Sequence, residues 1–189
     1  MCESTYGNRL HGEVTSDIQL ARIINEAHRR NAPILIPAFA VGRTQELLYM
    51  IRELEDENKI PSLPVIVDSP MAAQATQIYN RWSEEHDEEY ASILAKKVHP
   101  LKTDWMKTAA TREESKQLNN MKGARIIISA SGMLTGGRVL HHAMRILPQE
   151  NATIVFVGYQ AAGTTGRRIL NGEPEARIMK EWIRVRCNV

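Results

Sequence analysis

The sequence has few cysteines, few aromatic residues and no long run of apolar residues. Its two cysteines, Cys2 and Cys187, lie near opposite ends of the 189 residues, so we expect neither a disulfide framework nor a zinc knuckle. No stretch approaches the roughly 20 apolar residues that a membrane helix needs. The first residues do not resemble a signal peptide. We therefore expect a protein of the reducing cytoplasm that has no membrane partner.

Several common site motifs are missing as well. Residues 163–167 (GTTGR) are not followed by the Gly-Lys-Ser/Thr of a Walker loop, and no Gly-x-Gly-x-x-Gly fingerprint occurs. No His-x-His-x-Asp-His motif occurs, and the histidines lack ligand spacing. The adjacent His141 and His142 point about 100 degrees apart on a helix, which favours a structural or surface role. We expect no metal site here, with His141 still a candidate for the ligand crevice.

Short apolar segments separated by helical patterns are what the sequence does contain. Residues 34–36, 65–67, 125–128 and 153–157 predict buried strands, and apolar residues at helical spacing lie between them. Ser16 and Gln19 predict a capping box at the first helix. Residues 83–123 look helical but irregular. This alternation predicts an α/β fold, a Rossmann-like parallel sheet with helices on both faces, as one compact unit.

Polar turns follow all four predicted strands, at residues 39–43, 68–71, 129–133 and 158–164. The carboxyl ends of parallel strands share one edge, where ligands bind and where helix N-termini offer free N–H groups to phosphates. Asp68 is either functional or the N-cap of the following helix. Phe39 and Tyr159 either stack on bases or close the core. The predicted RNA or phosphate contacts are Phe39, Arg43, Ser69, Ser129, Ser131, Gly132, Arg138, His141, Tyr159, Gln160, Gly163, Thr164 and Arg167.

Five ordered sequence blocks resemble the β-CASP family of the metallo-β-lactamase superfamily. They are ESTYGNRLH at 3–11, IPAFAVGRTQELL at 36–48, VDSPMA at 67–72, SASGM at 129–133 and GYQAAGT at 158–164. Members of this family include RNA-degrading nucleases and the pre-mRNA 3′-end cleavage endonuclease. The resemblance implies a β-CASP domain inserted into a metallo-β-lactamase domain, with single-stranded RNA in the cleft between them. It also implies a zinc-dependent ribonuclease in which two zinc ions hydrolyse the phosphodiester.

The resemblance further implies a division of the chain and a role for one acidic residue. Residues 1–15 match the end of a metallo-β-lactamase half, 16–167 the β-CASP domain, and 168–189 the return towards the metallo-β-lactamase domain. Glu3 matches the family's catalytic acidic residue, which orients a histidine located downstream. The family's zinc ligands match nothing in these 189 residues. We therefore expect the metallo-β-lactamase domain of the same parent to be missing, and the isolated chain to be inactive.

Two other functions stay open at this point. One is a stand-alone nucleic-acid-binding module without catalysis, and the other is a Rossmann-like nucleotide binder. The sequence also leaves open a homo-oligomer, the preferred RNA sequence, and whether cleavage is endonucleolytic or exonucleolytic.

Overall fold

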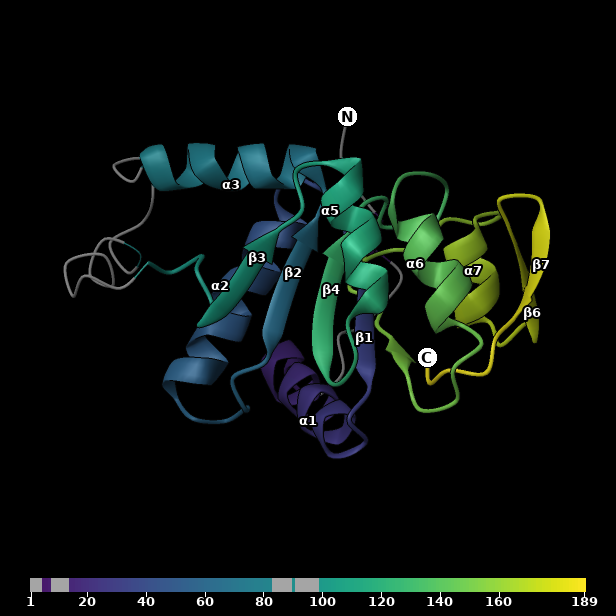
Figure 1. Cartoon of the computed structure of the whole chain (residues 1–189), viewed down its shortest axis with the longest axis horizontal. Helices are drawn as coiled ribbons and strands as arrows, with labels where there is room; N and C mark the ends of the chain where they lie inside the picture. Colours follow the sequence, from purple (N-terminus) through teal and green to yellow (C-terminus); the bar gives the residue numbers. More distant parts are fainter. Residues whose placement is uncertain (1–4, 8–13, 83–89, 91–98) are drawn as a thin grey trace.

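A computed structural model, which describes residues 5–7, 14–82, 90 and 99–189, contains a five-stranded sheet at its centre (Figure 1). All neighbouring strands of this sheet are parallel, in the order β3-β2-β4-β1-β5. The predicted parallel α/β fold is therefore confirmed. The strands are β1 (Pro33–Pro37), β2 (Pro64–Asp68), β3 (Trp105–Thr108), β4 (Arg125–Ser129) and β5 (Thr153–Ile154).

Helices cover both faces of the sheet because successive strand residues point to opposite sides. Ile34, Val65 and Ile126 face a core shared with α1 and α2, while Leu35 and Ile127 face the core beneath α6 and α7. The central strands β1 and β4 are buried along their whole length, which explains their nearly continuous apolar sequences. The helices are α1 (Ser16–Arg29), α2 (Arg43–Asp56), α3 (Pro70–Arg81), α5 (Arg112–Gln117), the 3-10 helix η2 (Leu118–Asn120), α6 (Val139–Ile146) and α7 (Thr165–Leu170).

Two local predictions were wrong. β3 falls within the segment predicted to be helical, and it lacks an apolar pattern because it is an edge strand with exposed Trp105 and Lys107. The capping box predicted at Ser16 is not formed, since Thr15 is the N-cap of α1 and makes no side-chain cap hydrogen bond. The side-chain amide of Gln19 instead donates to the carbonyl oxygen of Val14 at 2.9 Å.

The C-terminal residues form a separate antiparallel hairpin beside α7, made of β6 (Glu175–Ile178) and β7 (Glu181–Arg184) (Figure 1). Ala176 and Ile178 of this hairpin join the same core as α6 and α7, so the hairpin is packed against the sheet unit. Cys187 is buried in that core as a free thiol. Among the described residues, no helix is both long enough and apolar enough to cross a membrane.

Candidate functional site

The turns that follow β1, β4 and β5 contact one another at the carboxyl edge of the sheet. The backbone N–H of Ala38 donates to the carbonyl oxygen of Ser129 at 3.0 Å. Gly132 lies so close to Phe39 that a Cβ atom there would be 3.2 Å from the Phe39 nitrogen. The side-chain amide of Gln160 donates to the carbonyl oxygen of Gly132 at 3.0 Å. The prediction that these segments meet along one edge is confirmed.

Asp68 ends β2 at the same edge, and its carboxylate is fully buried. One oxygen, Oδ1, accepts a hydrogen bond from the Arg138 guanidinium at 2.8 Å. The other oxygen, Oδ2, lies 2.6 Å from the hydroxyl of Ser115 and 2.6 Å from Nε2 of His142. A single carboxylate therefore joins strand β2 to residues at the start of α6 and within α5 and α6. We call Asp68, Ser115, Arg138 and His142 the Asp68 cluster.

Burial and hydrogen bonding act in opposite directions on this carboxylate. Burial raises the pKa of Asp68, because a low-dielectric interior disfavours the charged form. The hydrogen bonds from His142, Ser115 and Arg138 outweigh burial, so the pKa of Asp68 lies below its ordinary value of 3.8. Asp68 is therefore ionised at neutral pH, and its charge is balanced by the Arg138 guanidinium.

Arg138 has further partners in addition to Asp68. Its guanidinium donates to the carbonyl oxygens of Ala109 and Ala110, at 2.8 and 3.1 Å. Three of its hydrogen bonds are thus made within the protein, and its side chain is 20% exposed. Arg138 therefore connects the turn after β3 to the start of α6. Its predicted contact with phosphate stays a prediction.

The N-cap interpretation of Asp68 is wrong. Ser69 is the N-cap of α3, and its hydroxyl accepts from the backbone N–H of Ala72 at 3.2 Å. The interpretation of His141 and His142 as a structural or surface pair fits their positions, since His142 is buried on Asp68 while His141 is exposed. Sequence reasoning missed Ser115 altogether, because nothing local indicates a partner 47 residues away.

The predicted hydroxyl residues all form hydrogen bonds within the turns. Ser129 donates to the carbonyl oxygen of Asp68 at 2.8 Å. Ser131 accepts from the backbone N–H of Thr135 at 3.1 Å, and Thr164 caps α7 by accepting from Arg167 at 3.2 Å. These contacts hold the turns in shape. Phosphate binding by the same hydroxyls stays a prediction.

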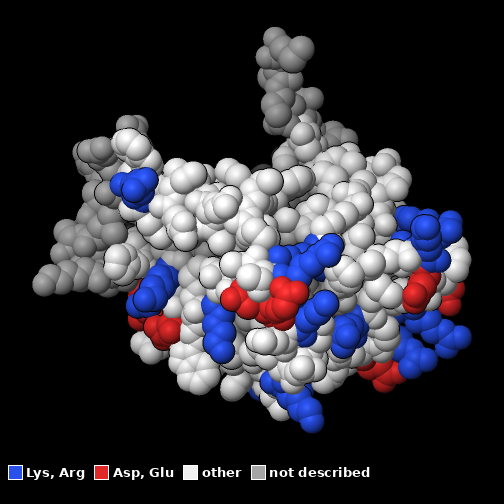
Figure 2. Space-filling model, turned by 45° about the horizontal axis from the view of Figure 1, so that its top comes forward, with Lys and Arg blue, Asp and Glu red and all other residues white. Residues whose placement is uncertain are grey.

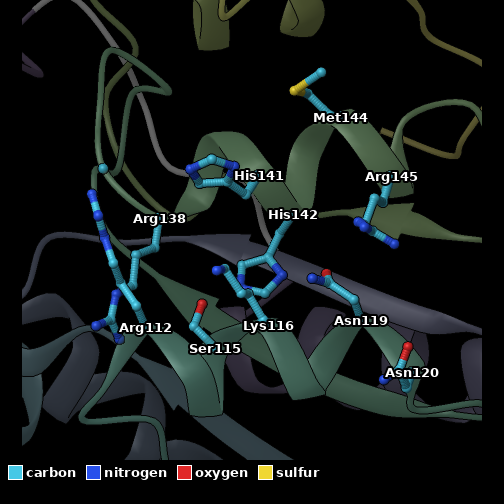
Figure 3. Close-up of a pocket in the computed structure, with 11 residues that line it drawn as sticks. Arg112, Ser115, Lys116, Asn119, Asn120, Arg138, His141, His142, Met144 and Arg145 are labelled. Atoms are coloured by element: carbon cyan, nitrogen blue, oxygen red, sulfur yellow. The ribbon is translucent and has the colours of Figure 1, made fainter.

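The other predicted residues differ in how accessible they are. Phe39 is 51% exposed at the edge, which suits a stacking surface. Arg43 forms an exposed ion pair with Glu46 at 2.6 Å. Gly163 has a φ of +82°, and Gln160, in the same turn, is buried. His141 lies on α6 (Figure 3). The guanidinium of Arg167 donates to the carbonyl oxygen of Gln160 at 3.4 Å.

The first sequence block reaches the same edge through an aromatic contact. The rings of Tyr6 and Tyr159 meet edge to face, with centroids 6.2 Å apart and an interplanar angle of 88°. Tyr159 therefore has an aromatic neighbour from the N-terminal segment. Glu3, the predicted catalytic residue, lies outside the described residues.

The described residues do not supply a metal centre. Among them, no three His, Cys, Asp or Glu side chains are gathered so that they could hold a metal ion. The Asp68 cluster contributes only one carboxylate and one imidazole, and the carboxylate is already neutralised by an arginine. This donor set does not fit a zinc ion, whose sites in proteins have three or four protein ligands.

Comparison with known proteins adds independent findings. A family model described as the Beta-Casp domain matches residues 44–169. Ribonuclease TTHA0252 from Thermus thermophilus is 33% identical over 190 residues, which cover 100% of this chain and 44% of that protein. Transcription termination factor FttA from a Lokiarchaeum species is 32% identical, covering 96% of this chain and 29% of that protein. An RNase J-like protein from Methanocaldococcus jannaschii is 31% identical, covering 99% of this chain and 43% of that protein. The chain thus spans less than half the length of each of these relatives.

Proposed function

Because this chain belongs to the β-CASP family, we propose that it is the RNA-holding portion of a metal-dependent ribonuclease that hydrolyses RNA phosphodiesters. Relatives named ribonuclease and RNase J-like support a hydrolytic nuclease as the parent. A relative named transcription termination factor is compatible with the same class of substrate. The stand-alone binding module and the nucleotide binder have no comparable support.

One observation carries this proposal: three turns from distant parts of the chain meet at one sheet edge that also exposes an aromatic ring. Phe39 offers a flat apolar surface to a base, and such stacking contributes about 1–3 kcal/mol per base. Backbone N–H groups near helix starts and the guanidinium of Arg43 would contact phosphates. An edge of this kind holds single-stranded RNA without requiring a particular sequence.

We also propose that the metal is zinc and that its ligands come from outside the described residues. The donor set of the Asp68 cluster supports the placement of the ligands outside the described residues, since it offers too few free ligands. The role of the described residues is then to bind and orient the RNA backbone. Glu3 is proposed as a residue that positions a proton-transferring group in the parent.

The test is a cleavage assay with the full-length parent on a labelled single-stranded RNA. We expect cleavage that stops with a chelator and returns with added zinc. Glu3→Gln should reduce kcat at least about tenfold with little change in RNA affinity, because a positioned proton-transfer group contributes about 10²–10⁴-fold. Glu181→Gln, at an exposed position in the hairpin, is the matched control and should be fully active.

The isolated chain of 189 residues should bind the same RNA and leave it intact. Zinc-dependent cleavage by this chain alone would contradict the proposal, as would a fully active Glu3→Gln parent. A parent that neither binds nor cleaves RNA would remove the ribonuclease assignment. Binding without any cleavage by the full-length parent would instead favour a binding module.

A further inference from the structure

A second polar feature lies beside the carboxyl edge, between α5–η2 and α6. It is a groove of about 1270 Å³. In Figure 3, His142 and Arg145 extend from α6 towards α5, which carries Ser115 and Lys116, and towards η2. The groove is lined by Arg112, Ser115, Lys116, Asn119, Asn120, Gly137, Arg138, His141, His142, Met144 and Arg145.

The lining of this groove is cationic. No Asp or Glu belongs to it within the described part of the chain. Arg112, Lys116 and Arg145 are exposed, and none of the three forms an ion pair with another described residue. Figure 2 shows Lys and Arg side chains around an acidic group near the centre of its view. Charges without a protein partner, placed along one hollow, attract an anion.

Some arginines elsewhere in the fold are paired instead. Arg22 and Arg168 each form an ion pair with a glutamate on the same helix or just beyond it. The groove cations instead lie beside the amide groups of Asn119 and Asn120, which can donate hydrogen bonds to an oxygen-rich ligand. The groove thus combines free charge with neutral donors, a combination typical of sites that bind a nucleic-acid backbone.

The groove is continuous with the carboxyl edge through two residues of the Asp68 cluster. Arg138 and His142 line the groove and also hold Asp68 at the end of β2. From Arg138 to Arg145 the groove follows α6 for about 10 Å, at 1.5 Å per residue. A ligand that leaves the edge beside Arg138 therefore meets further cations along the same direction.

We propose that this groove is a second RNA-binding site that holds the phosphodiester backbone of the strand outside the carboxyl edge. This inference rests on the proposed function. The shared chemistry is a row of phosphate groups, which a free polyphosphate also carries. The length of the groove along α6 and its continuity with the carboxyl edge favour an RNA strand over a compact ion. The two asparagine side chains add donors for ribose or base oxygens.

The experiment measures the affinity of the chain for a fluorescent 12-nucleotide oligouridylate between 50 and 300 mM salt, taken as a working range. The groove variant combines Arg112→Gln, Lys116→Gln and Arg145→Gln. Each lost phosphate contact lowers the slope of log affinity against log salt by about 0.7 for single strands, so we expect a loss of about 2. At the lowest salt the affinity should fall at least about tenfold.

The matched control combines Lys102→Gln, Arg177→Gln and Lys180→Gln, three exposed positions outside the groove with the same change in net charge. This control should keep the wild-type slope. Circular dichroism and thermal unfolding should show both triple variants folded, because all six positions are exposed. Equal losses in the two variants, or no loss in the groove variant, would overturn the proposal.

Two competition measurements identify the ligand of the groove. Inorganic tripolyphosphate and an oligoglutamate of equal charge are each added to the complex with the labelled RNA. An RNA strand in the groove requires that neither displaces it at equal charge concentration. Complete displacement by tripolyphosphate would assign the groove to free polyphosphates, and displacement by oligoglutamate would assign it to an acidic protein; either result overturns the RNA site. If the groove variant keeps the wild-type salt slope while the parent still cleaves RNA, only the groove proposal is refuted. If the wild-type parent does not cleave RNA, the proposed function itself is refuted.

Discussion

Replacing Asp68 with alanine should destabilise the fold by about 3–5 kcal/mol, the usual cost of breaking a buried ion pair. The carboxylate is fully buried and has three side-chain partners at 2.6–2.8 Å. Without it, Arg138 keeps the carbonyl oxygens of Ala109 and Ala110 but loses its counter-charge. Asp68→Asn retains the size and part of the hydrogen bonding, so its cost should be smaller, about 1–3 kcal/mol.

Urea unfolding of the chain measures these losses. With an m-value of about 2 kcal/mol per molar urea, a 4 kcal/mol loss shifts the midpoint by about 2 M. Asp104→Ala is the matched control, because Asp104 pairs with Arg52 at 3.0 Å while its side chain is 48% exposed. An exposed pair of this kind contributes about 0–1 kcal/mol. If Asp68→Ala costs no more than Asp104→Ala, the reasoning about the cluster is refuted.

The comparison of the wild type with Asp68→Asn also predicts how stability depends on pH. The folded-state pKa of Asp68 lies below 3.8, so its stabilisation is present above the unfolded-state pKa and is lost as the pH falls through the folded-state pKa. The stability difference between the wild type and Asp68→Asn should therefore narrow as the pH falls below about 4. A difference that widens in acid would show that the sign of the pKa shift is wrong.

Three further predictions test other parts of the fold. Gly137→Ala should cost more than about 2 kcal/mol in urea unfolding, because the φ of Gly137 is +84° and the new Cβ would meet the carbonyl oxygen of Ala130. The control Gly172→Ala has a similar φ of +82° but open space around the new Cβ, so it should cost about 1 kcal/mol. Burial raises the pKa of Cys187 to about 11, so in a Cys2→Ser variant this thiol should react with Ellman's reagent at pH 8 only upon unfolding; rapid reaction of that variant in the native state would contradict this. Thr111→Ala removes one half of a capping box, the hydroxyl that accepts from the backbone N–H of Glu114, and should cost about 1 kcal/mol, measured by the same urea assay.

The sequence predicted the parts of the fold that local pattern determines. Buried strands at β1, β2 and β4 are nearly continuous runs of apolar residues, so their positions were predicted to within a residue or two. The common edge followed from strand direction alone. β5 is shorter than predicted, since residues 155–157 continue as irregular chain. The edge strand β3 has too little buried surface to leave a pattern.

The candidate site was only partly predictable, for a different reason. Asp68 was recognised as either functional or a helix cap, and the structure removes the second interpretation. Its partners Arg138 and His142 lie 70 and 74 residues away along the chain. No periodicity connects residues at such separations, so these contacts become visible only when α6 is packed against the sheet. The roles of the predicted RNA contacts are still predictions.

The strand order has a consequence for how the chain folds. β1 and β2 do not pair with each other, because β4 lies between them and hydrogen bonds to both. During synthesis both early strands must therefore wait, each with an unsatisfied backbone edge, until residues 125–129 have left the ribosome. Non-local pairing of this kind slows folding and exposes intermediates to aggregation. A nascent chain stalled before residue 125 should need a chaperone, while one that also extends through α7 and the β6–β7 hairpin, whose residues complete the second core, should fold by itself.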